Sequence, residues 1–595
     1  MEADPQQTPR KWLLPRLRLR LWLAELFHFS ELQVTLFWAG VIGFAGALSS
    51  VAFRKLTDFV HWVFTRQTTG GYVLSFMNLL WWQRLLIPAL GGIIAGLIIY
   101  FGTRLARKSS TDYMEAIVLG DGVVSFRSSM VKCASAMFSI ASGASIGREG
   151  PLVQLSAVLA SLFGRWRGMP PLQLRLLVAC GAAAGIASAY NAPIGGALFV
   201  AEIVLQSLAM ETFGPLVFAS VVATLTIRRL LGDSPLYEIQ IPSVRLHSNW
   251  EILPYFLLGL LAGLVAPWFL RLLRASERLF SKLPLPVYLR IALGGLTVGA
   301  LAILHPQVCG NGYSVINQVL HEHVVWQVLL VIFVFKLLAT AATFGSGAVG
   351  GVFTPTLFAG ACLGVLYCDF VQRIWPGPPL VPAAFALVGM GAFLSATTHA
   401  PLMAIIILFE LTLDYDIILP LMLACVVAHY TCSAFEKNSV YSESLKRKGF
   451  GAFRQELGAL SVADIMRANP VAVGENARFT EIAENFVRNR FNYLYVIDDE
   501  KTFRGVISLH DIKSYLNDPE LAQLVIARDI LQEGFPTIVP EASLATALER
   551  FSHHDGERLP VTSSRNGQRL LGSISKTDLL LALTEQKPAT TAAAA

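Results

Sequence analysis

Charged side chains are scarce in this chain of 595 residues, where Asp, Glu, Lys and Arg together make up only 15%. Hydrophobic residues make up 54%, and the mean hydropathy of +0.55 excludes an ordinary soluble protein of this length. Uncharged windows of about the 20 residues that span a bilayer occur at 35–53, 85–103 and 252–270. The sequence therefore predicts a protein that crosses the membrane several times.

Three patterns are missing from the sequence: metal or disulfide spacing of the cysteines, a signal-peptide pattern in the N-terminal segment, and the residue clusters of an enzyme. Its seven cysteines lie mostly in apolar runs without metal-binding or disulfide spacing, so we expect neither a metal site nor disulfides. The N-terminal segment opens acidic and has no small-residue cleavage site, so we expect no signal peptide. No nucleophile–base cluster is visible, and a net charge of +6 does not indicate a nucleic-acid partner.

Basic residues gather just before the first apolar window, at Arg10, Lys11, Arg16, Arg18 and Arg20. Cytoplasmic ends of membrane proteins carry such an excess of positive charge. We expect residues 1–32 to be cytoplasmic and to lie on the membrane surface as an amphipathic helix. This orientation predicts a multi-pass protein of the cell (inner) membrane, with its soluble C-terminal region also in the cytoplasm.

The composition changes near residue 447, where a soluble α/β region begins. Within it Asp464-Ile465 matches Asp529-Ile530 at an offset of 65 residues, and Asp511 matches Asp578 at an offset of 67. Two copies of a β-α-β-β-α unit predict one pseudo-symmetric module. The expected parts are a linker at 448–460, the two units at 461–520 and 521–587, and a disordered tail at 588–595.

A second repeat lies in the expected membrane region, 33–447. Internal duplication is typical of transporters, so we predict an all-α region made of two halves, about 33–232 and 250–435. Residues 181–202 align with 389–410, and both stretches end in glutamate. Residues 131–151 align without a gap on 335–355, pairing Lys132 with Lys336, Ser142-Gly143-Ala144 with Ser346-Gly347-Ala348, Gly147 with Gly351, and Pro151 with Pro355.

The stretch "SGASIGREGPLVQ", residues 142–154, lies between two apolar runs, which indicates a helix broken inside the membrane. The helix that follows, starting near Pro151 and in the other half near Pro355, has free N–H groups and the positive end of its dipole at the break. Two such ends facing each other predict an anion site without a full positive charge. Glu149 would compete there, because its ionised carboxylate can occupy the position of an anion.

At these residues the chain resembles the CLC family of chloride channels and chloride/proton antiporters. "GREGP" and "GGVFTP" match two hallmark motifs of that family, and "TDYMEAI" and "ATTHAPLM" look most like the bacterial ClcB-type voltage-gated chloride channels. The C-terminal pair is similar to CBS domains. The resemblance implies chloride as the transported ion, a homodimer in the lipid bilayer, about 18 mostly membrane-embedded helices in an inverted repeat, and no required cofactor.

The resemblance also implies site residues, position by position. Glu149 matches the gating glutamate, and Tyr441 matches an inner-gate tyrosine that contacts the central anion, with an interfacial aromatic residue as the alternative. The family's GSGIP motif is missing, and "KSSTDYMEAI" in its place makes Ser109, or else Ser110, the nearest match to the anion-binding serine. The other expected anion-binding residues are Gly147, Arg148, Gly150, Gly351, Val352 and Phe353.

Antiporters of this family carry a proton-relay glutamate in an "FIIEEM"-like sequence, and here "FVAEIV" places Ile203 at that position, after Glu202. An isoleucine does not carry a proton. We therefore expect passive, voltage- or pH-gated chloride conduction with Glu149 as the gate, and proton-coupled antiport is the alternative.

Four further charged residues recur symmetrically in the two halves. Glu202 and Glu410 end equivalent apolar stretches and are expected to be structural or interfacial. Lys132 and Lys336 either raise the electrostatic potential along the pore or extend to a membrane interface.

Each soluble unit ends with the pattern Gly-h-h-Ser-x-x-Asp, where h is hydrophobic. Such a strand-to-helix turn suits a nucleotide, with the hydroxyl on a phosphate and the carboxylate on the ribose. The similarity to CBS domains implies an adenine nucleotide, and the alternative is a structural module that binds nothing. For the whole protein, a further alternative is a scaffold that senses nucleotides and transports nothing, but such a scaffold would not need the two broken helices of the membrane region. The candidate nucleotide-binding residues are Ser508, Asp511, Ser575, Thr577 and Asp578.

Overall fold

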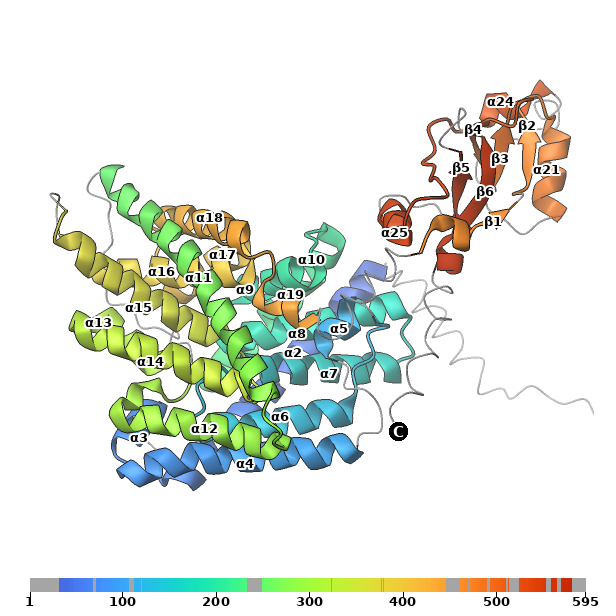
Figure 1. The fold of residues 1–595 in the computed structure, drawn as a ribbon. Coiled ribbons are helices and arrows are strands. Elements are labelled where there is room, and N and C mark those ends of the chain that lie inside the picture. The colour runs from blue at the N-terminus through green and yellow to red at the C-terminus, as the bar shows by residue number, and fades with distance from the viewer. Residues whose placement is uncertain are drawn as a thin grey trace, which may run out of the picture. The chain divides into compact units, whose positions relative to one another are not determined.

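The computed structural model divides the chain into two compact units, Met1–Glu443 and Ser444–Ala595 (Figure 1). It describes residues 31–67, 71–105, 112–118, 120–232, 249–322, 324–375, 377, 379–445, 460–468, 470–488, 493–509, 512, 524–552, 558–563 and 569–579. The expected surface helix up to residue 30, the serines Ser109 and Ser110, the linker up to residue 459, Asp511 and the tail lie outside the described residues.

Helices make up the regular secondary structure of the first unit's described part. Its first half contains α2 (Glu31–Thr65), α3 (Gly71–Met77), α4 (Trp81–Leu105), α5 (Tyr113–Val118), α6 (Phe126–Ala141), α7 (Glu149–Trp166), α8 (Pro171–Tyr190), α9 (Pro193–Leu198), the π-helix η1 (Phe199–Leu205) and α10 (Met210–Leu231). Its second half contains α11 (Ile252–Ser281), α12 (Val287–Leu304), the short 3₁₀ helix η3 (Pro306–Val308), α13 (Tyr313–His321), α14 (Trp326–Gly345), α15 (Phe353–Gln372), α16 (Pro382–Thr398), α17 (Pro401–Thr412), α18 (Ile418–Phe435) and α19 (Val440–Leu445). Within the described residues, nine helices are long and apolar enough to cross a membrane, which confirms the predicted multi-pass architecture.

The predicted duplication is visible in the order and the ends of the helices. The series α6 to α10 recurs as α14 to α18, and α7 packs against α8 as α15 packs against α16. After α8 and α16 the chain adopts a left-handed conformation at Asn191 (φ 57°) and His399 (φ 58°). After α6 and α14 it does so at Gly143 (φ 95°) and Gly347 (φ 93°). The two halves therefore share backbone conformation at matching residues.

Small residues let the paired helices approach closely in both halves. A Cβ atom on Gly181 of α8 would lie 2.7 Å from the carbonyl oxygen of Ser156 on α7. The matching residue of α16, Gly389, would place a Cβ atom 2.3 Å from the carbonyl oxygen of Gly360 on α15. Close packing of this kind stabilises helices in lipid, where burial of apolar surface gives no advantage.

The two helices that follow the breaks start earlier than predicted. Helix α7 begins at Glu149 and α15 begins at Phe353, each two residues before the proline expected near its start. Proline is tolerated at the third helical position because the N–H group it lacks has no partner inside the helix. The earlier start makes Glu149 itself the first residue of a helix.

The second unit is an α/β module with two three-stranded sheets. Its strands are β1 (Arg467–Ala468), β2 (Ala472–Gly474), β3 (Tyr493–Ile497), β4 (Phe503–Ser508), β5 (Arg558–Thr562) and β6 (Leu570–Ser575). The sheet orders are β2-β3-β4 and β1-β6-β5, with β2 parallel to β3 and the other pairs antiparallel. Its helices are η5 (Val462–Asp464), α21 (Phe479–Arg488), α24 (Ala527–Ile530) and α25 (Leu544–Ser552).

The two copies in this unit exchange their leading segments. Arg467 in β1, at the start of the first copy, pairs with Ser573 in β6 of the second copy. At the start of the second copy, Gln532 forms a reciprocal bridge with Val506 in β4 of the first. Because each copy completes the sheet of the other, the tandem repeat is one interlocked module.

Candidate anion site

The two broken helices meet through matching glycines. The Gly147 N–H donates a hydrogen bond to the Gly351 carbonyl at 2.7 Å, and the Gly351 N–H donates one to the Gly147 carbonyl at 3.0 Å. These residues precede α7 and α15, and they are the pair that the sequence repeat aligns. The loops before the two helices are therefore joined at the point where the halves of the first unit correspond.

The Glu149 carboxylate lies in the gap between these two loops. A Cβ atom on Gly147 would lie 2.1 Å from Glu149 Oε2, and a Cβ atom on Gly351 would lie 2.7 Å from Glu149 Cδ. The side chain is buried, with 3% of the residue exposed. Only glycine on both sides leaves room for the carboxylate in this position.

Both carboxylate oxygens of Glu149 accept hydrogen bonds from one residue of the opposite half, Thr354. The Thr354 N–H donates to Oε1 at 2.9 Å, and the Thr354 hydroxyl donates to Oε2 at 3.2 Å. Thr354 is the second residue of α15, so the carboxylate lies at the positive end of that helix, where anions bind. Thr354 is not among the residues predicted from the sequence, although a hydroxyl residue at a helix start within "GGVFTP" is an available signal.

Four other predicted anion-site residues belong to the same two broken segments. Val352 precedes α15 directly and Phe353 begins it, and both are buried. A Cβ atom on Gly150 would lie 3.5 Å from the Gly351 backbone nitrogen, so Gly150 also faces the opposite loop. The Arg148 guanidinium lies 5.7 Å from the centre of the Tyr313 ring, at distances suited to a cation–π contact.

Tyr441 is connected to the start of α15 through a row of aromatic rings. Its ring centre lies 5.4 Å from that of Phe199, with the rings perpendicular. Phe199 lies 6.3 Å from Phe353, and Phe353 lies 4.8 Å from Tyr190. The structure therefore brings Tyr441, from the end of the first unit, toward the same place as Glu149.

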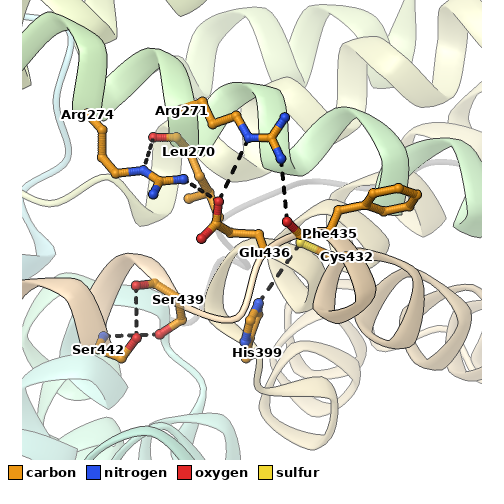
Figure 2. A network of polar contacts seen from close by, with 9 residues as sticks. All are labelled: Leu270, Arg271, Arg274, His399, Cys432, Phe435, Glu436, Ser439 and Ser442. Carbon is orange, nitrogen blue, oxygen red and sulfur yellow. Dashed lines mark hydrogen bonds and ion pairs between the residues drawn. The ribbon is translucent and has the colours of Figure 1, made fainter.

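An ion-pair network fixes the segment that leads into α19, the helix that carries Tyr441. Glu436 follows α18 directly, and its carboxylate is paired with Arg274 of α11 (Figure 2). Arg271, one turn earlier on α11, lies 3.9 Å from the same carboxylate oxygen. These contacts attach Glu436 to α11. At the start of α19 the Ser442 N–H donates to the Ser439 hydroxyl oxygen at 3.1 Å.

A cavity of about 130 Å³ lies beside the start of α7. It is lined by Gly150 and Gly350 from the two broken segments, and by Lys132, Asp112 and Gln154. Asp112 lines the same cavity, so its negative charge offsets the positive charge of Lys132 there. The effect of Lys132 on the potential along the pore stays a prediction.

Lys336, the counterpart of Lys132 in the repeat, has a different role. It is 1% exposed, and its Nζ donates to the carbonyls of Val308 at 2.9 Å and Gly310 at 2.6 Å. Its Nζ also lies 5.6 Å from the centre of the Phe358 ring. Extension to a membrane interface is therefore wrong for Lys336, because its ammonium group is enclosed by protein.

Glu202 and Glu410 cap helices of the opposite halves in a reciprocal arrangement. The Glu202 carboxylate accepts from the N–H groups of Leu402 at 3.2 Å and Met403 at 2.7 Å, at the start of α17. The Glu410 carboxylate accepts from Ile194 at 2.9 Å and Gly195 at 2.7 Å, at the start of α9. This geometry agrees with the structural role expected for both residues.

In the second unit, Asp578 is engaged by neighbouring side chains. Arg467 donates to Oδ1 at 3.0 Å from Nε and 2.6 Å from Nη2, and the Ser575 hydroxyl donates to Oδ2 at 2.6 Å. Thr577 is exposed. Ser508 ends β4, and its partner in the predicted pattern, Asp511, lies outside the described residues.

These contacts determine the ionisation of Asp578. Burial opposes its charge, but the hydrogen bonds from Ser575 and Arg467 outweigh burial and hold the pKa of the carboxyl below its ordinary value. A carboxyl whose pKa is lowered by folding stabilises the fold at pH values above its ordinary pKa. That contribution is lost as the pH falls through the lowered pKa.

These features define a polytopic membrane protein of the inverted-repeat transporter class, with a carboxylate at the junction of the repeats. The family described as "Voltage gated chloride channel" matches residues 90–433, and the CBS domain matches 462–518 and 527–585. The chain belongs to the CLC family of chloride transport proteins and carries a pair of CBS domains.

Relatives of the chain carry names of this family. It is 50% identical over 414 residues to a ClcB-like chloride channel protein of Ralstonia nicotianae, a match that covers 69% of this chain and 96% of the relative. It is 41% identical over 413 residues to the voltage-gated ClC-type chloride channel ClcB of Salmonella typhimurium, covering 68% and 97%. These alignments take in nearly all of each relative and leave almost a third of this chain unmatched.

Solved structures share the fold. A slow cyanobacterial Cl⁻/H⁺ antiporter is 25% identical, with a TM-score of 0.62 over 70% of this chain and 97% of that chain. A eukaryotic CLC transporter, 19% identical, has a TM-score of 0.63 over 92% of this chain and 99% of that chain. The second match extends over most of the chain, so it includes residues beyond the membrane unit.

Proposed function

We propose that the chain conducts chloride passively down its electrochemical gradient and that protonation of Glu149 gates this conduction. The observation that carries the proposal is the position of the Glu149 carboxylate, between Gly147 and Gly351 with both oxygens on Thr354. The ionised carboxylate takes the place of an anion at the start of α15. A protonated carboxyl has no charge to offer these donors, so chloride displaces it more readily.

Passive conduction is supported by the residues beside the antiporter relay position. Proton exchange needs a group that binds and releases protons between the cytoplasm and Glu149. Ile203 is a buried apolar residue, and the adjacent Glu202 is turned toward the amides of α17. The similarity to a Cl⁻/H⁺ antiporter makes proton-coupled exchange the second candidate.

The test is chloride-driven proton movement in proteoliposomes. We expect a chloride gradient to drive chloride flux, measured with a chloride electrode, without uphill movement of protons in the same vesicles. Valinomycin and potassium control the membrane potential, and protein-free vesicles give the proton leak. Uphill proton movement in fixed ratio to chloride would overturn passive conduction and establish exchange.

Glu202→Gln and Glu410→Gln form a matched pair, because each residue caps the start of a helix from the opposite half. We expect each change to lower stability by about 1 kcal/mol, since an amide offers one acceptor oxygen in place of two. Chloride flux and its pH dependence should stay within about twofold of the parent for both. If Glu202→Gln alone altered the pH dependence or any proton movement, Glu202 would belong to the proton path.

For the CBS pair we propose an adenine nucleotide as the ligand class. A ribose bound by Asp578 displaces the two hydrogen bonds that Arg467 makes to this carboxylate. We therefore expect Arg467→Ala to bind nucleotide more tightly and Asp578→Ala to bind it more weakly, each by about threefold to tenfold. Calorimetry of the full chain with ATP and AMP checks this. Absence of heat from the parent at millimolar nucleotide would favour a structural module.

A further inference from the structure

The Thr354 hydroxyl links the gate carboxylate to a second buried hydroxyl. Thr354 is 1% exposed, and its Oγ1 lies 3.2 Å from Glu149 Oε2 and 3.0 Å from the Tyr190 hydroxyl oxygen. Tyr190 is itself 1% exposed. Three polar side chains from α7, α15 and α8 therefore form one chain of hydrogen bonds inside the protein.

The ionised carboxylate fixes the direction of this chain. A carboxylate only accepts hydrogen bonds, and a threonine hydroxyl has a single hydrogen to donate. The Thr354 hydrogen is therefore directed to Glu149, and the Tyr190 hydroxyl donates to Thr354 Oγ1. Each donor polarises the next, which strengthens the bond to the carboxylate.

The surrounding structure holds Tyr190 in position for this role. Tyr190 is the last residue of α8, and its ring lies against Phe353 at 4.8 Å between ring centres. The Arg54 guanidinium caps the same helix end, with hydrogen bonds to the carbonyls of Ser188 at 2.5 Å and Ala189 at 2.8 Å. The orientation of Tyr190 therefore does not depend on Glu149.

Building on the proposed function, we propose that the Thr354 hydroxyl, oriented by Tyr190, latches the Glu149 carboxylate in the closed gate and becomes a ligand of the transported anion when the carboxylate withdraws. When the carboxylate leaves, either of the Tyr190 and Thr354 hydroxyls can donate to the other, and an anion in the vacated space restores the original direction, with Tyr190 donating to Thr354 and Thr354 donating to the anion. A buried donor without an acceptor costs free energy, and an anion in that space satisfies it.

Other charged and titratable groups also act on the Glu149 carboxylate. Arg148 and Tyr313 interact with it electrostatically, as does Tyr441 from α19. Arg54 interacts in turn with Arg148. All four are left unchanged in the variants below, but Thr354→Ala also removes the hydrogen bond between the side chains of Thr354 and Tyr313. Tyr190→Phe keeps that bond, so it separates the two contributions to a shift in the pH profile.

The latch is tested by chloride efflux from proteoliposomes with the full chain. We expect Thr354→Ala to raise efflux near neutral pH by about fivefold and to move half-maximal efflux to higher pH, because the ionised carboxylate loses a donor. Thr354→Ser keeps the hydroxyl and should behave like the parent. Tyr190→Phe keeps the ring and should give a smaller change in the same direction.

A buried threonine outside the site provides the control. Thr397 is fully buried in α16, and its hydroxyl bonds the Phe393 carbonyl of the same helix at 2.9 Å. Thr397→Ala should leave both efflux and its pH profile as in the parent. An unchanged pH profile in Thr354→Ala would overturn the latch, as would an equal shift in Thr354→Ser. If Thr354→Ala does not fold, the pH profile of chloride efflux through Tyr190→Phe tests the latch in its place.

The ligand role is tested with the gate removed. In a Glu149→Ala background, chloride titrated by calorimetry into the detergent-solubilised protein should bind about fivefold more weakly when Thr354 is alanine than when it is serine or threonine. Equal affinities would overturn the ligand role. Failure of the proposed function gives a different result: chloride efflux through Glu149→Ala with Thr354 intact would still depend on pH.

Discussion

Glu149→Gln should leave chloride transport active and abolish its dependence on pH. The carboxylate lies between the two glycine loops with its oxygens on Thr354, and it competes with the anion only while it is charged. The glutamine of Glu149→Gln is never charged, and the alanine of a second variant, Glu149→Ala, leaves the gap open. We expect the efflux of the parent to rise by about tenfold on acidification by a few units. The efflux of both variants should change by less than about twofold.

The measurement is chloride efflux from proteoliposomes over a series of pH values, with valinomycin to remove the electrical limit on flux. Glu410→Gln is the matched control, because this carboxylate also accepts amide hydrogen bonds at a helix start but lies at α9. It should keep the pH profile of the parent. Efflux through Glu149→Ala that rose with acid as steeply as in the parent would show that another group is the gate.

Lys336→Met should sharply reduce the amount of folded protein. The Lys336 ammonium group satisfies the carbonyls of Val308 and Gly310 in a fully buried place. Methionine has a similar length but no donor, so both carbonyls lose their partner. Each unsatisfied buried group costs about 1–3 kcal/mol, which is a large share of the stability of a folded domain.

Size-exclusion chromatography in detergent and the half-denaturation temperature measure this loss. Lys132→Met is the natural comparison, since Lys132 aligns with Lys336 in the repeat but lines a cavity. It should fold like the parent, and any loss of chloride flux measures the effect of the Lys132 charge beside Asp112. If Lys336→Met and Lys132→Met were equally stable, the hydrogen bonds from Lys336 to the carbonyls of Val308 and Gly310 would not be what stabilises this part of the fold.

The features that the sequence predicted correctly are those that depend on composition and on spacing along the chain. Long uncharged windows predicted the spanning helices, and the register of 131–151 on 335–355 paired Gly147 with Gly351, which meet in the structure. The same alignment gave identical expectations for Lys132 and Lys336. They differ because the carbonyls that enclose Lys336 come from residues 308–310, which no local pattern connects to it.

The contribution of Thr354 required the folded geometry. In the sequence it is one hydroxyl residue between Phe353 and Pro355, and such residues commonly serve at helix starts. Its role depends on which side chain lies opposite, and that side chain, Glu149, comes from the other half of the unit. The two-residue error in the start of α7 and α15 has a local cause, since proline marks the first turn of a helix but not its first residue.

The bonds between Gly147 and Gly351 also constrain how this protein is made. The two residues are 204 positions apart, so during synthesis α7 exists well before any residue of α15 has left the ribosome. Contacts between such distant residues form late, because the long intervening chain must first be placed. Until α15 has been made, the Glu149 carboxylate therefore lacks the N–H group and the hydroxyl of Thr354, to which it is hydrogen-bonded in the complete protein. A chain whose synthesis stops before residue 351 lacks this gate, and the gate is complete only when both halves of the membrane unit have been assembled.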